Sequence, residues 1–564
     1  MKTARALVCL ALPLLSLVVH ADDVMIKTKD GATLSATVEL PVGAKGKLPT
    51  ILVFDIYANP DVIRQQAGEF AARGFAGVVA DVRGKRLSPE APVPYEHDAR
   101  DVREVIAWIS RQPWSNGKVG MVGGSYSGFT AWAATKYPHP ALKGIAVSAA
   151  AIPGQGLPMY NNVFVNANYA WAFYVTNNKL LDDKIYADSQ RWWELTRNWF
   201  TSDRPFRQID AMDGTPNPWL QRWLQHPSYD AYWQSMVPYG KEYARIGIPA
   251  LTITGYYDDG QISALHYLKE HVKRRRHAEH YLVIGPYDHS GTHARNKPDK
   301  LRDYTIDAAA KIDSQELKMA FMDYVLRGGP KPALLEDRIN YEVMGANEWR
   351  HVPTLAAMHT TSKRLYFSKE PRGDLMALNA AAPAANSFVT HTVDFTDRVQ
   401  FHNFHSYPAP IVQRKLQLPT EAIFVTEPFK DGAVVSGAFT GELTVSINKQ
   451  DFDLGVAVYE GLADGTLFHL GYALQRASYG DDPTQRRLLT PGKPTDIAFE
   501  TTLVSKRLNP GSSLLVLLDV NKHPMAQVNY GTGKDVSDET VKDAGEPLEL
   551  KILSGSYLEV PLDR

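Results

Sequence analysis

The sequence predicts an α/β domain that is interrupted by a helical insertion and followed by an all-β domain. Three observations indicate this order. Apolar strand patterns first alternate with helical patterns, a stretch holding seven of the eleven tryptophans then breaks that alternation, and short alternating strands with Gly, Pro and Asp turns follow. We expect a mostly parallel sheet over residues 22–150 and 246–335, a helical cap over 151–245 and a two-sheet β sandwich over 336–564.

The first 21 residues have the pattern of a secretory signal peptide. Lys2 and Arg5 give a basic start, residues 6–19 are apolar, and His20-Ala21 ends a small-residue cleavage site. We expect cleavage after Ala21 and a secreted or periplasmic protein. Cys9 is the only cysteine and lies inside this segment, so the mature chain would depend on a large core and not on disulfides.

The charge balance argues against two classes of partner. The chain carries 61 basic and 62 acidic residues, which gives no large field to attract nucleic acid or an anionic membrane. We expect neither as a partner. Whether the chain forms a homo-oligomer is left open.

Buried strand patterns in the first half place their ends at one edge of the predicted sheet. After a hairpin signal at Asp30-Gly31, such patterns cover residues 50–57, 77–83, 118–124, 144–150, 250–258 and 280–289, with helical patterns at 61–73 and 97–111. Active sites of parallel sheets are built at the carboxyl ends of the strands. Residues that follow these strands are therefore the first candidates for chemistry.

Ser125 lies where one of these strands turns abruptly into a helical pattern. Glycines flank it at Gly123, Gly124 and Gly128. A tight strand-to-helix turn projects the serine side chain from the sheet, and the N–H groups of the helix start would face a bound carbonyl oxygen. The pattern departs from G-x-S-x-G, because Ser127 stands where the second glycine is expected. By itself it also fits an ordinary glycine-rich loop.

An acid and a histidine follow in the chain order that a serine nucleophile requires. Asp258 ends the strand pattern 250–258, and His289 ends the pattern 280–289. A serine needs a base, and the base needs an acid to fix its tautomer. Asp259 and Asp288 compete for the acid role. We favour Asp258, because it comes first after the strand.

Several motifs together resemble one family of serine hydrolases. They are Tyr57, Asp81-Val-Arg-Gly84, the run from Gln112 to Gly128, Gly255-Tyr-Tyr-Asp258, Gly285-Pro-Tyr-Asp-His289, the run from Met344 to Trp349, and Asp451-Phe-Asp453. They resemble the family that includes cocaine esterase, α-amino acid ester hydrolases, glutaryl acylases and X-Pro dipeptidyl peptidases of the S15 type. Its nucleophile motif has the second glycine three places after the serine, as Gly128 is here. The resemblance implies an α/β-hydrolase core with a helical cap and a carboxyl-terminal jelly roll.

The resemblance also implies roles for single residues. Ser125 would be the nucleophile, His289 the base and Asp258 the acid, while the Tyr57 phenol and the backbone N–H of Tyr126 would form the oxyanion hole. No cofactor is expected. No metal is expected either, because neither His402 and His405 nor His289 and His293 have partners at zinc-ligand spacing.

The substrate is less well defined by the sequence. The α-amino acid ester hydrolases carry acidic residues shortly after the catalytic acid, and here those places hold Gly260 and Gln261. We expect an exported serine hydrolase of small esters or amides or of short peptides. X-Pro dipeptidyl peptidase is the alternative activity. A catalytically silent hydrolase fold that acts as a binding module is an alternative of another class.

Overall fold

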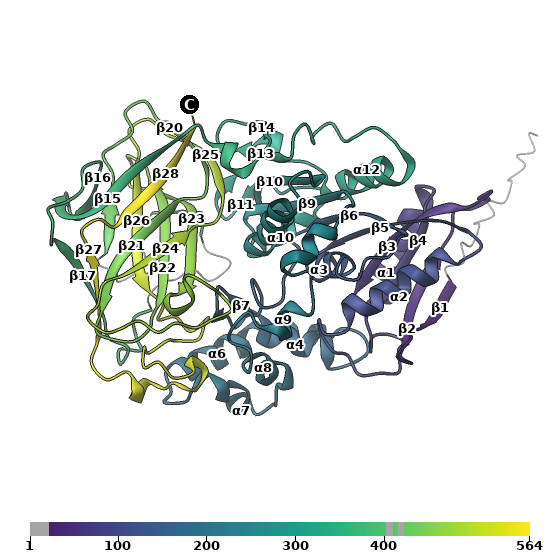
Figure 1. The fold of residues 1–564 in the computed structure, drawn as a ribbon, viewed down its shortest axis with the longest axis horizontal. Helices are drawn as coiled ribbons and strands as arrows, with labels where there is room; N and C mark the ends of the chain where they lie inside the picture. Colours follow the sequence, from purple (N-terminus) through teal and green to yellow (C-terminus); the bar gives the residue numbers. More distant parts are fainter. Residues whose placement is uncertain (1–21, 402–409, 415–421, 564) are drawn as a thin grey trace, which may run out of the picture.

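The computed structural model describes residues 22–401, 410–414 and 422–563 of the 564-residue chain. The predicted signal segment and the residues His402 and His405 lie outside these ranges. The first part of the chain forms a sheet of ten strands (Figure 1). In spatial order the strands are β1 (Asp22–Lys27), β2 (Thr33–Glu39), β4 (Ala76–Asp81), β3 (Leu48–Asp55), β5 (Ser115–Gly124), β6 (Leu142–Ser148), β9 (Ala250–Tyr257), β10 (His280–Asp288), β13 (Ile339–Val343) and β14 (Glu348–Val352).

Most of this sheet is parallel, as the sequence predicts. Every neighbouring pair from β4 through β13 runs parallel, whereas β1 and β2 at one edge and β14 at the other are antiparallel. The carboxyl ends of β5, β9 and β10 therefore lie at the same edge, which brings Ser125, Asp258 and His289 to one side of the molecule.

Helices cover both faces because the central strands are apolar on both sides. On β3, Ile51 and Val53 pack in the cluster that includes Ile63 of α1 (Pro60–Ala72) and Phe321 of α12 (Ser314–Arg327). Alternate residues of β3 pack in the other cluster, with α2 (Asp98–Ser110) and α3 (Tyr126–Ala133), and α10 (Gln261–Arg274) packs on β9 beside them. This two-residue alternation is what a doubly covered sheet requires.

The expected start of the β sandwich at residue 336 is too early, because the first two strands after it pair with the α/β sheet. The strands β13 and β14, which the sequence pattern assigns to the β sandwich, extend the first sheet instead. The reason is that β10 offers an unpaired edge, and Ile339 pairs with Leu282 of that strand. Residues 339–352 thus belong structurally to the α/β part.

The insertion between β6 and β9 is helical, as predicted. It contains α4 (Ala167–Thr176), α5 (Asp183–Tyr186), α6 (Ser189–Phe200), α7 (Ile209–Asp213), α8 (Pro218–Trp223) and α9 (Ala231–Gln234). Four of its tryptophans, Trp171, Trp199, Trp223 and Trp233, are buried and belong to the main core cluster. The aromatic residues of the cap therefore act mainly as core.

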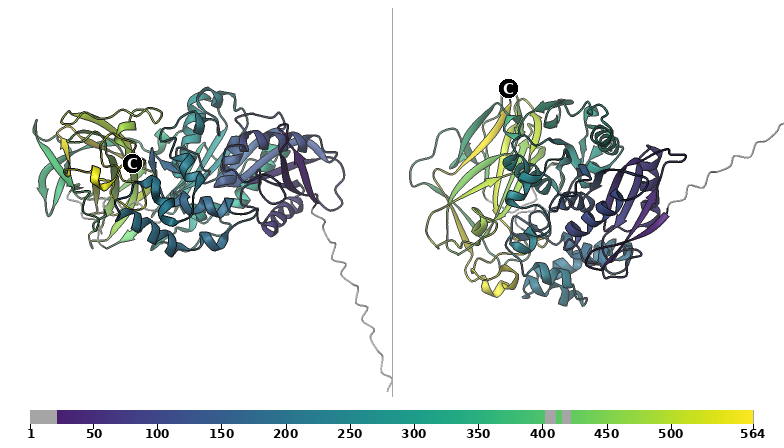
Figure 2. Two further views of the ribbon diagram at one scale, coloured as in Figure 1. Left: turned by 90° about the horizontal axis from the view of Figure 1, so that it is seen from below. Right: turned by 45° about the vertical axis from the view of Figure 1, so that its right-hand side comes forward.

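The rest of the chain forms a largely antiparallel β sandwich that lies beside the α/β part in all views (Figures 1 and 2). Its strands are β15 (Thr361–Arg372), β16 (Leu375–Asn379), β17 (Phe388–Val393), β18 (Val412–Gln413), β19 (Ile423–Val425), β20 (Ala433–Gly437), β21 (Thr440–Ile447), β22 (Asp453–Gly461), β23 (Leu467–Arg476), β24 (Thr495–Glu500), β25 (Val504–Leu508), β26 (Ser513–Val520), β27 (Leu548–Leu553) and β28 (Tyr557–Asp563). The predicted fold class is confirmed.

In the part of the chain that the structure describes, every helix is too short or too polar to serve as a membrane span.

Candidate active site

Ser125 occupies a strained turn between β5 and α3. Its φ of 56° and ψ of −117° lie outside the regions that residues other than glycine normally adopt. The turn is held from both sides, because the Ser125 N–H donates to the Ser148 carbonyl at 3.0 Å and the Ser125 carbonyl accepts from Phe129 and Ala151. Strain that is over-determined in this way is typical of functional sites.

Close packing explains the glycine spacing around Ser125. A Cβ on Gly128 would lie 2.9 Å from the Cα and Cβ of Ala150, where α3 meets the loop after β6. A Cβ on Gly124 would lie 2.3 Å from the imidazole of His293. The position after Ser127 therefore requires glycine, and the apparent misplacement in the motif is a packing requirement.

Ser127 braces the turn, a role that the sequence did not reveal. Its hydroxyl accepts from the Gly124 N–H at 3.0 Å and lies 2.9 Å from the Gly124 carbonyl, to which it donates. The side chain thereby closes the turn from within and substitutes for backbone hydrogen bonds that the sharp reversal cannot make.

Tyr57 lies beside Ser125, just beyond the end of β3. Its half-buried phenol oxygen accepts a hydrogen bond from the Trp171 indole N–H at 3.0 Å and also interacts with the Ser125 side chain. Burial raises the pKa of Tyr57 far above its ordinary value, so the phenol stays protonated and is available as a donor.

Tyr126 is fixed by its own hydroxyl group. The hydroxyl donates to Asp98 Oδ2 at 3.0 Å and accepts from the Tyr95 N–H at 2.8 Å. As the first residue of α3, Tyr126 has a backbone N–H without a partner inside the helix. This N–H and the Tyr57 phenol flank Ser125.

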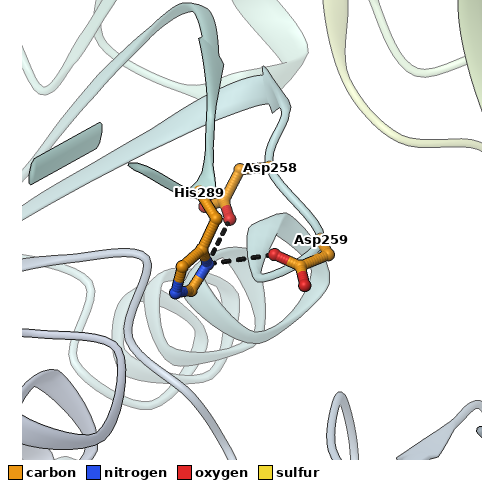
Figure 3. A group of neighbouring side chains, drawn as sticks. All are labelled: Asp258, Asp259 and His289. Carbon is orange, nitrogen blue, oxygen red and sulfur yellow. Dashed lines mark hydrogen bonds and ion pairs between the residues drawn. The ribbon is translucent and has the colours of Figure 1, made fainter. Parts of the chain in front are cut away.

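His289 and Asp258 form a hydrogen-bonded pair at the ends of β10 and β9. The His289 Nδ1 and Asp258 Oδ1 atoms are 3.1 Å apart with hydrogen-bond geometry. Asp258 is 3% exposed, and Thr254 Oγ1 and the Gly260 N–H donate to its two oxygens at 2.8 and 2.9 Å. The acid is therefore buried and oriented, and the other ring nitrogen of His289 points away from it (Figure 3).

Asp259 forms a second ion pair with the same nitrogen. Its Oδ1 lies 2.9 Å from His289 Nδ1, so the ring nitrogen lies between two carboxylates (Figure 3). Only the Asp258 contact has the angles of a hydrogen bond. The competitor Asp288 instead caps α11 (His289–His293) by accepting from the Gly291 N–H at 2.8 Å.

The two carboxylates determine the protonation of His289. Burial alone would lower its pKa, but the hydrogen bond and ion pairs to Asp258 and Asp259 raise the pKa well above the ordinary value of 6.5. The imidazolium form is thus strongly stabilised when no substrate is bound.

A cavity of about 890 Å³ joins these groups. One part of it is bounded by the site residues and by aromatic side chains of the cap. They include Tyr57, Ser125, Tyr126, Trp171, Tyr174, Tyr186, Asp259 and His289. A substrate in this cavity would touch the Ser125 and His289 side chains together, while Asp258 supports the ring from behind.

One group of side chains in the described ranges has the spacing of a metal site, namely Asp258, Asp259 and His289. A cation on His289 Nδ1 would displace the proton that joins the ring to Asp258. The two carboxylates therefore lie close to His289 because they support its imidazole ring, and not because they bind a metal with it.

Comparison with known families decides the class of the protein. Residues 30–291 match the model described as X-Pro dipeptidyl-peptidase (S15 family), and residues 335–547 match the model of the C-terminal non-catalytic domain of X-Pro dipeptidyl-peptidases. The chain belongs to the S15 family of serine hydrolases. Together the two models span well over half of it, and the resemblance inferred from the motifs is confirmed.

A curated relative and two solved structures are similar to this chain over nearly its whole length. Cocaine esterase of Rhodococcus sp. strain MB1 Bresler is 26% identical over 552 residues, covering 93% of this chain and 94% of the esterase. An aminopeptidase from a marine sediment Thaumarchaeota archaeon has a TM-score of 0.77 at 19% identity, with 100% and 99% of the two chains covered. An α-amino acid ester hydrolase has a TM-score of 0.75 at 22% identity, with 98% of each chain covered. The two structures show the shared fold.

Proposed function

We propose that this S15 hydrolase cleaves small esters or amides through a Ser125–His289–Asp258 triad and an acyl-enzyme intermediate. The observation that carries the proposal is the convergence of three strand ends. Ser125 and His289 line one cavity, and the ring is hydrogen-bonded at 3.1 Å to a buried acid. This is the arrangement of nucleophile, base and orienting acid.

In the first half of the reaction, His289 Nε2 would take the proton of the Ser125 hydroxyl as its oxygen attacks the substrate carbonyl. The Ser125 and His289 side chains form no hydrogen bond to each other in the described structure, and such bonds often tighten only when substrate is present. The Tyr57 O–H and the Tyr126 N–H would donate to the oxygen that becomes negative. The imidazolium would then protonate the leaving group.

In the second half, water would enter where the leaving group has departed. His289 would remove a proton from this water, which attacks the acyl carbonyl, and Ser125 would leave as its proton is restored. Asp258 would remain ionised throughout and stabilise the imidazolium. Every step uses residues of this chain alone.

Covalent labelling tests the proposal directly. We expect a fluorophosphonate to label the wild-type protein and not Ser125→Ala, because only an activated serine reacts. Ser290→Ala is the matched control, since it removes an exposed hydroxyl that lines the same cavity and leaves the nucleophile and its turn intact. Equal labelling of wild type and Ser125→Ala would refute the triad, and a protein that never labels would favour a silent binding module.

X-Pro dipeptidyl peptidase is the second candidate. The family models that match both parts of the chain support it. Gly-Pro and Ala-Pro anilides compared with 4-nitrophenyl acyl esters separate the two activities. A strong preference for the dipeptide anilides would favour the peptidase.

We also propose export, on the basis of the basic start, the apolar run and the small-residue site at Ala21. Amino-terminal sequencing of protein recovered from the periplasm or the medium should begin at Asp22. A protein that retains residues 1–21 in the cytoplasm would contradict this.

A further inference from the structure

The cavity at Ser125 is bounded by more than the site residues and the cap. A second part of its lining comes from Gly124, strands β3 and β5, and helices α1 and α12. Residues that bound this second part include Val53, Gln66, Phe70, Val122, Gln315 and Lys318. A substrate with two ends could thus reach beyond the aromatic part.

Lys318 is a buried residue of this second part. It is 3% exposed, and in the described structure its ammonium has one hydrogen bond, to Ser148 Oγ at 3.3 Å. No acidic side chain of the described residues lies within 4.0 Å of it. Ser148 links this site to the nucleophile, because its carbonyl accepts the Ser125 N–H at 3.0 Å.

The other buried lysines of the described chain have more hydrogen-bond partners. Their ammonium groups each contact two or three acceptors, mostly carbonyl or carboxylate oxygens. They are Lys85, Lys136, Lys297, Lys506 and Lys522. None of these lysines bounds the cavity at Ser125. Lys318 therefore has unused donors where a ligand can approach.

The groups around Lys318 are mostly basic or neutral. Burial and the nearby Lys297 lower its pKa to about 7, with Arg295 adding to the effect and Asp313 opposing it. His293 is held neutral because burial lowers its pKa well below 6.5, and Arg295 is paired with Glu69. No carboxylate of the described residues thus contacts the Lys318 ammonium as a counter-ion, which a buried ammonium normally requires.

We propose that Lys318 forms a subsite for a carboxylate carried by the substrate. The carboxylate oxygens would accept hydrogen bonds from the ammonium N–H groups that have no partner in the protein. The ester or amide would then lie at Ser125. The proposal rests on the hydrolase function above. The carboxylate could be carried by the acyl group or by the leaving group, since both flank the scissile bond.

Two matched substrate pairs distinguish these sources. Mono-4-nitrophenyl adipate against 4-nitrophenyl hexanoate tests the acyl side, and 4-butyryloxybenzoate against 4-carbamoylphenyl butyrate tests the leaving side. Each pair is assayed for kcat/KM at pH 7 with wild type, Lys318→Met and the control Lys297→Met. Lys297 is a buried neighbour that has its own acceptors and does not bound the cavity.

We expect wild type to prefer the carboxylate in one of the pairs. Lys318→Met should then lower kcat/KM for that substrate about tenfold to hundredfold, the range for one charged hydrogen bond, and change its neutral partner less than about threefold. Lys297→Met removes a charge that lowers the pKa of Lys318, so it should not lower kcat/KM for the carboxylate substrate. Should Lys318→Met fail to fold, the wild-type preference decides alone.

A wild-type preference for the neutral ester in both pairs, or an equal loss on all four substrates in Lys318→Met, would overturn the subsite. Ser125-dependent hydrolysis of the neutral esters would then still uphold the hydrolase. If Ser125→Ala leaves all four rates unchanged, the hydrolase proposal fails, and the carboxylate subsite, which rests on it, fails as well.

Discussion

His289 Nδ1 lies between two carboxylates, and this placement would control the pH at which the ring can act as the proposed base. The Asp258 and Asp259 oxygens are 3.1 and 2.9 Å from it. A general base must be neutral, and these charges raise the pKa of the ring above 6.5. We therefore expect kcat/KM to rise with pH through the raised pKa and to be lost below it.

Asp259→Asn should move that acid limb to lower pH. Removing one of the two negative charges destabilises the imidazolium form of His289. The pKa of the ring therefore falls, and the ring stays neutral in more acidic solution. Because the Asp259 side chain is 32% exposed, solvent screens part of its charge, so the limb should move to lower pH without disappearing. The pH dependence of kcat/KM on a neutral ester measures it.

Asp288→Asn is the control for this shift. Asparagine retains the cap on α11 and removes a charge that does not contact the ring. An acid limb that moves equally in both variants, or in neither, would remove Asp259 from the control of His289.

Tyr57→Phe should lower kcat about tenfold to a thousandfold with little change in the free energy of unfolding. The substitution removes one of the two proposed donors to the developing oxyanion and keeps the ring packing. Burst kinetics with a 4-nitrophenyl ester would locate the loss in the acylation step. An unchanged kcat would show that the phenol does not act on the oxyanion.

The positions of Ser125, Asp258 and His289 were predictable because each follows an apolar strand, and parallel strands end together. The contact between Asp259 and His289 and the sparse hydrogen bonding of the Lys318 ammonium were not predictable from the sequence. Both depend on side-chain directions set by neighbouring elements, which neither strand periodicity nor motif spacing encodes. The brace that Ser127 forms with Gly124 was not predictable for the same reason.

At the scale of elements, helix α4 connects the cap to the candidate oxyanion hole. Its Trp171 donates to the Tyr57 oxygen at 3.0 Å, which leaves the phenol hydrogen to point elsewhere. The tryptophan-rich composition indicated a cap over the site but not this contact. The cap is therefore more than a cover, since one of its helices orients a candidate catalytic group.

Trp171→Phe should lower kcat a few-fold to about tenfold, because the phenol loses the neutral hydrogen bond that orients it. Trp192→Phe is the matched control, since its indole donates to the Ile185 carbonyl within the cap. In a Tyr57→Phe background, Trp171→Phe should have little further effect. Additive losses would mean that Trp171 acts independently of Tyr57.

The sequence does not predict to which sheet β13 and β14 belong. Their alternating pattern resembles that of sandwich strands, and only the unpaired edge of β10 assigns them to the first sheet. Strand partners are chosen by long-range pairing, so a pattern identifies a strand more reliably than its sheet.

At the scale of the molecule, the β sandwich supports the loop that carries the two acids. Gln261 follows the loop directly, is 1% exposed, and exchanges two hydrogen bonds with the Leu503 backbone of the sandwich at 2.7 and 3.2 Å. Tyr257, which precedes Asp258, donates to the His469 carbonyl at 3.2 Å. The main hydrophobic cluster also continues through both parts.

Gln261→Ala should therefore affect both stability and catalysis. It leaves the Leu503 N–H and carbonyl buried without these partners, which should lower the free energy of unfolding by about 1 to 3 kcal/mol. It also loosens the turn that holds Asp258 and Asp259, so kcat/KM should fall while fluorophosphonate labelling of Ser125 is slowed and not abolished. Gln475→Ala is the control, because Gln475 bonds to Ala498 within the sandwich. Normal kcat/KM in a destabilised Gln261→Ala would show that the sandwich stabilises the fold without positioning the acids.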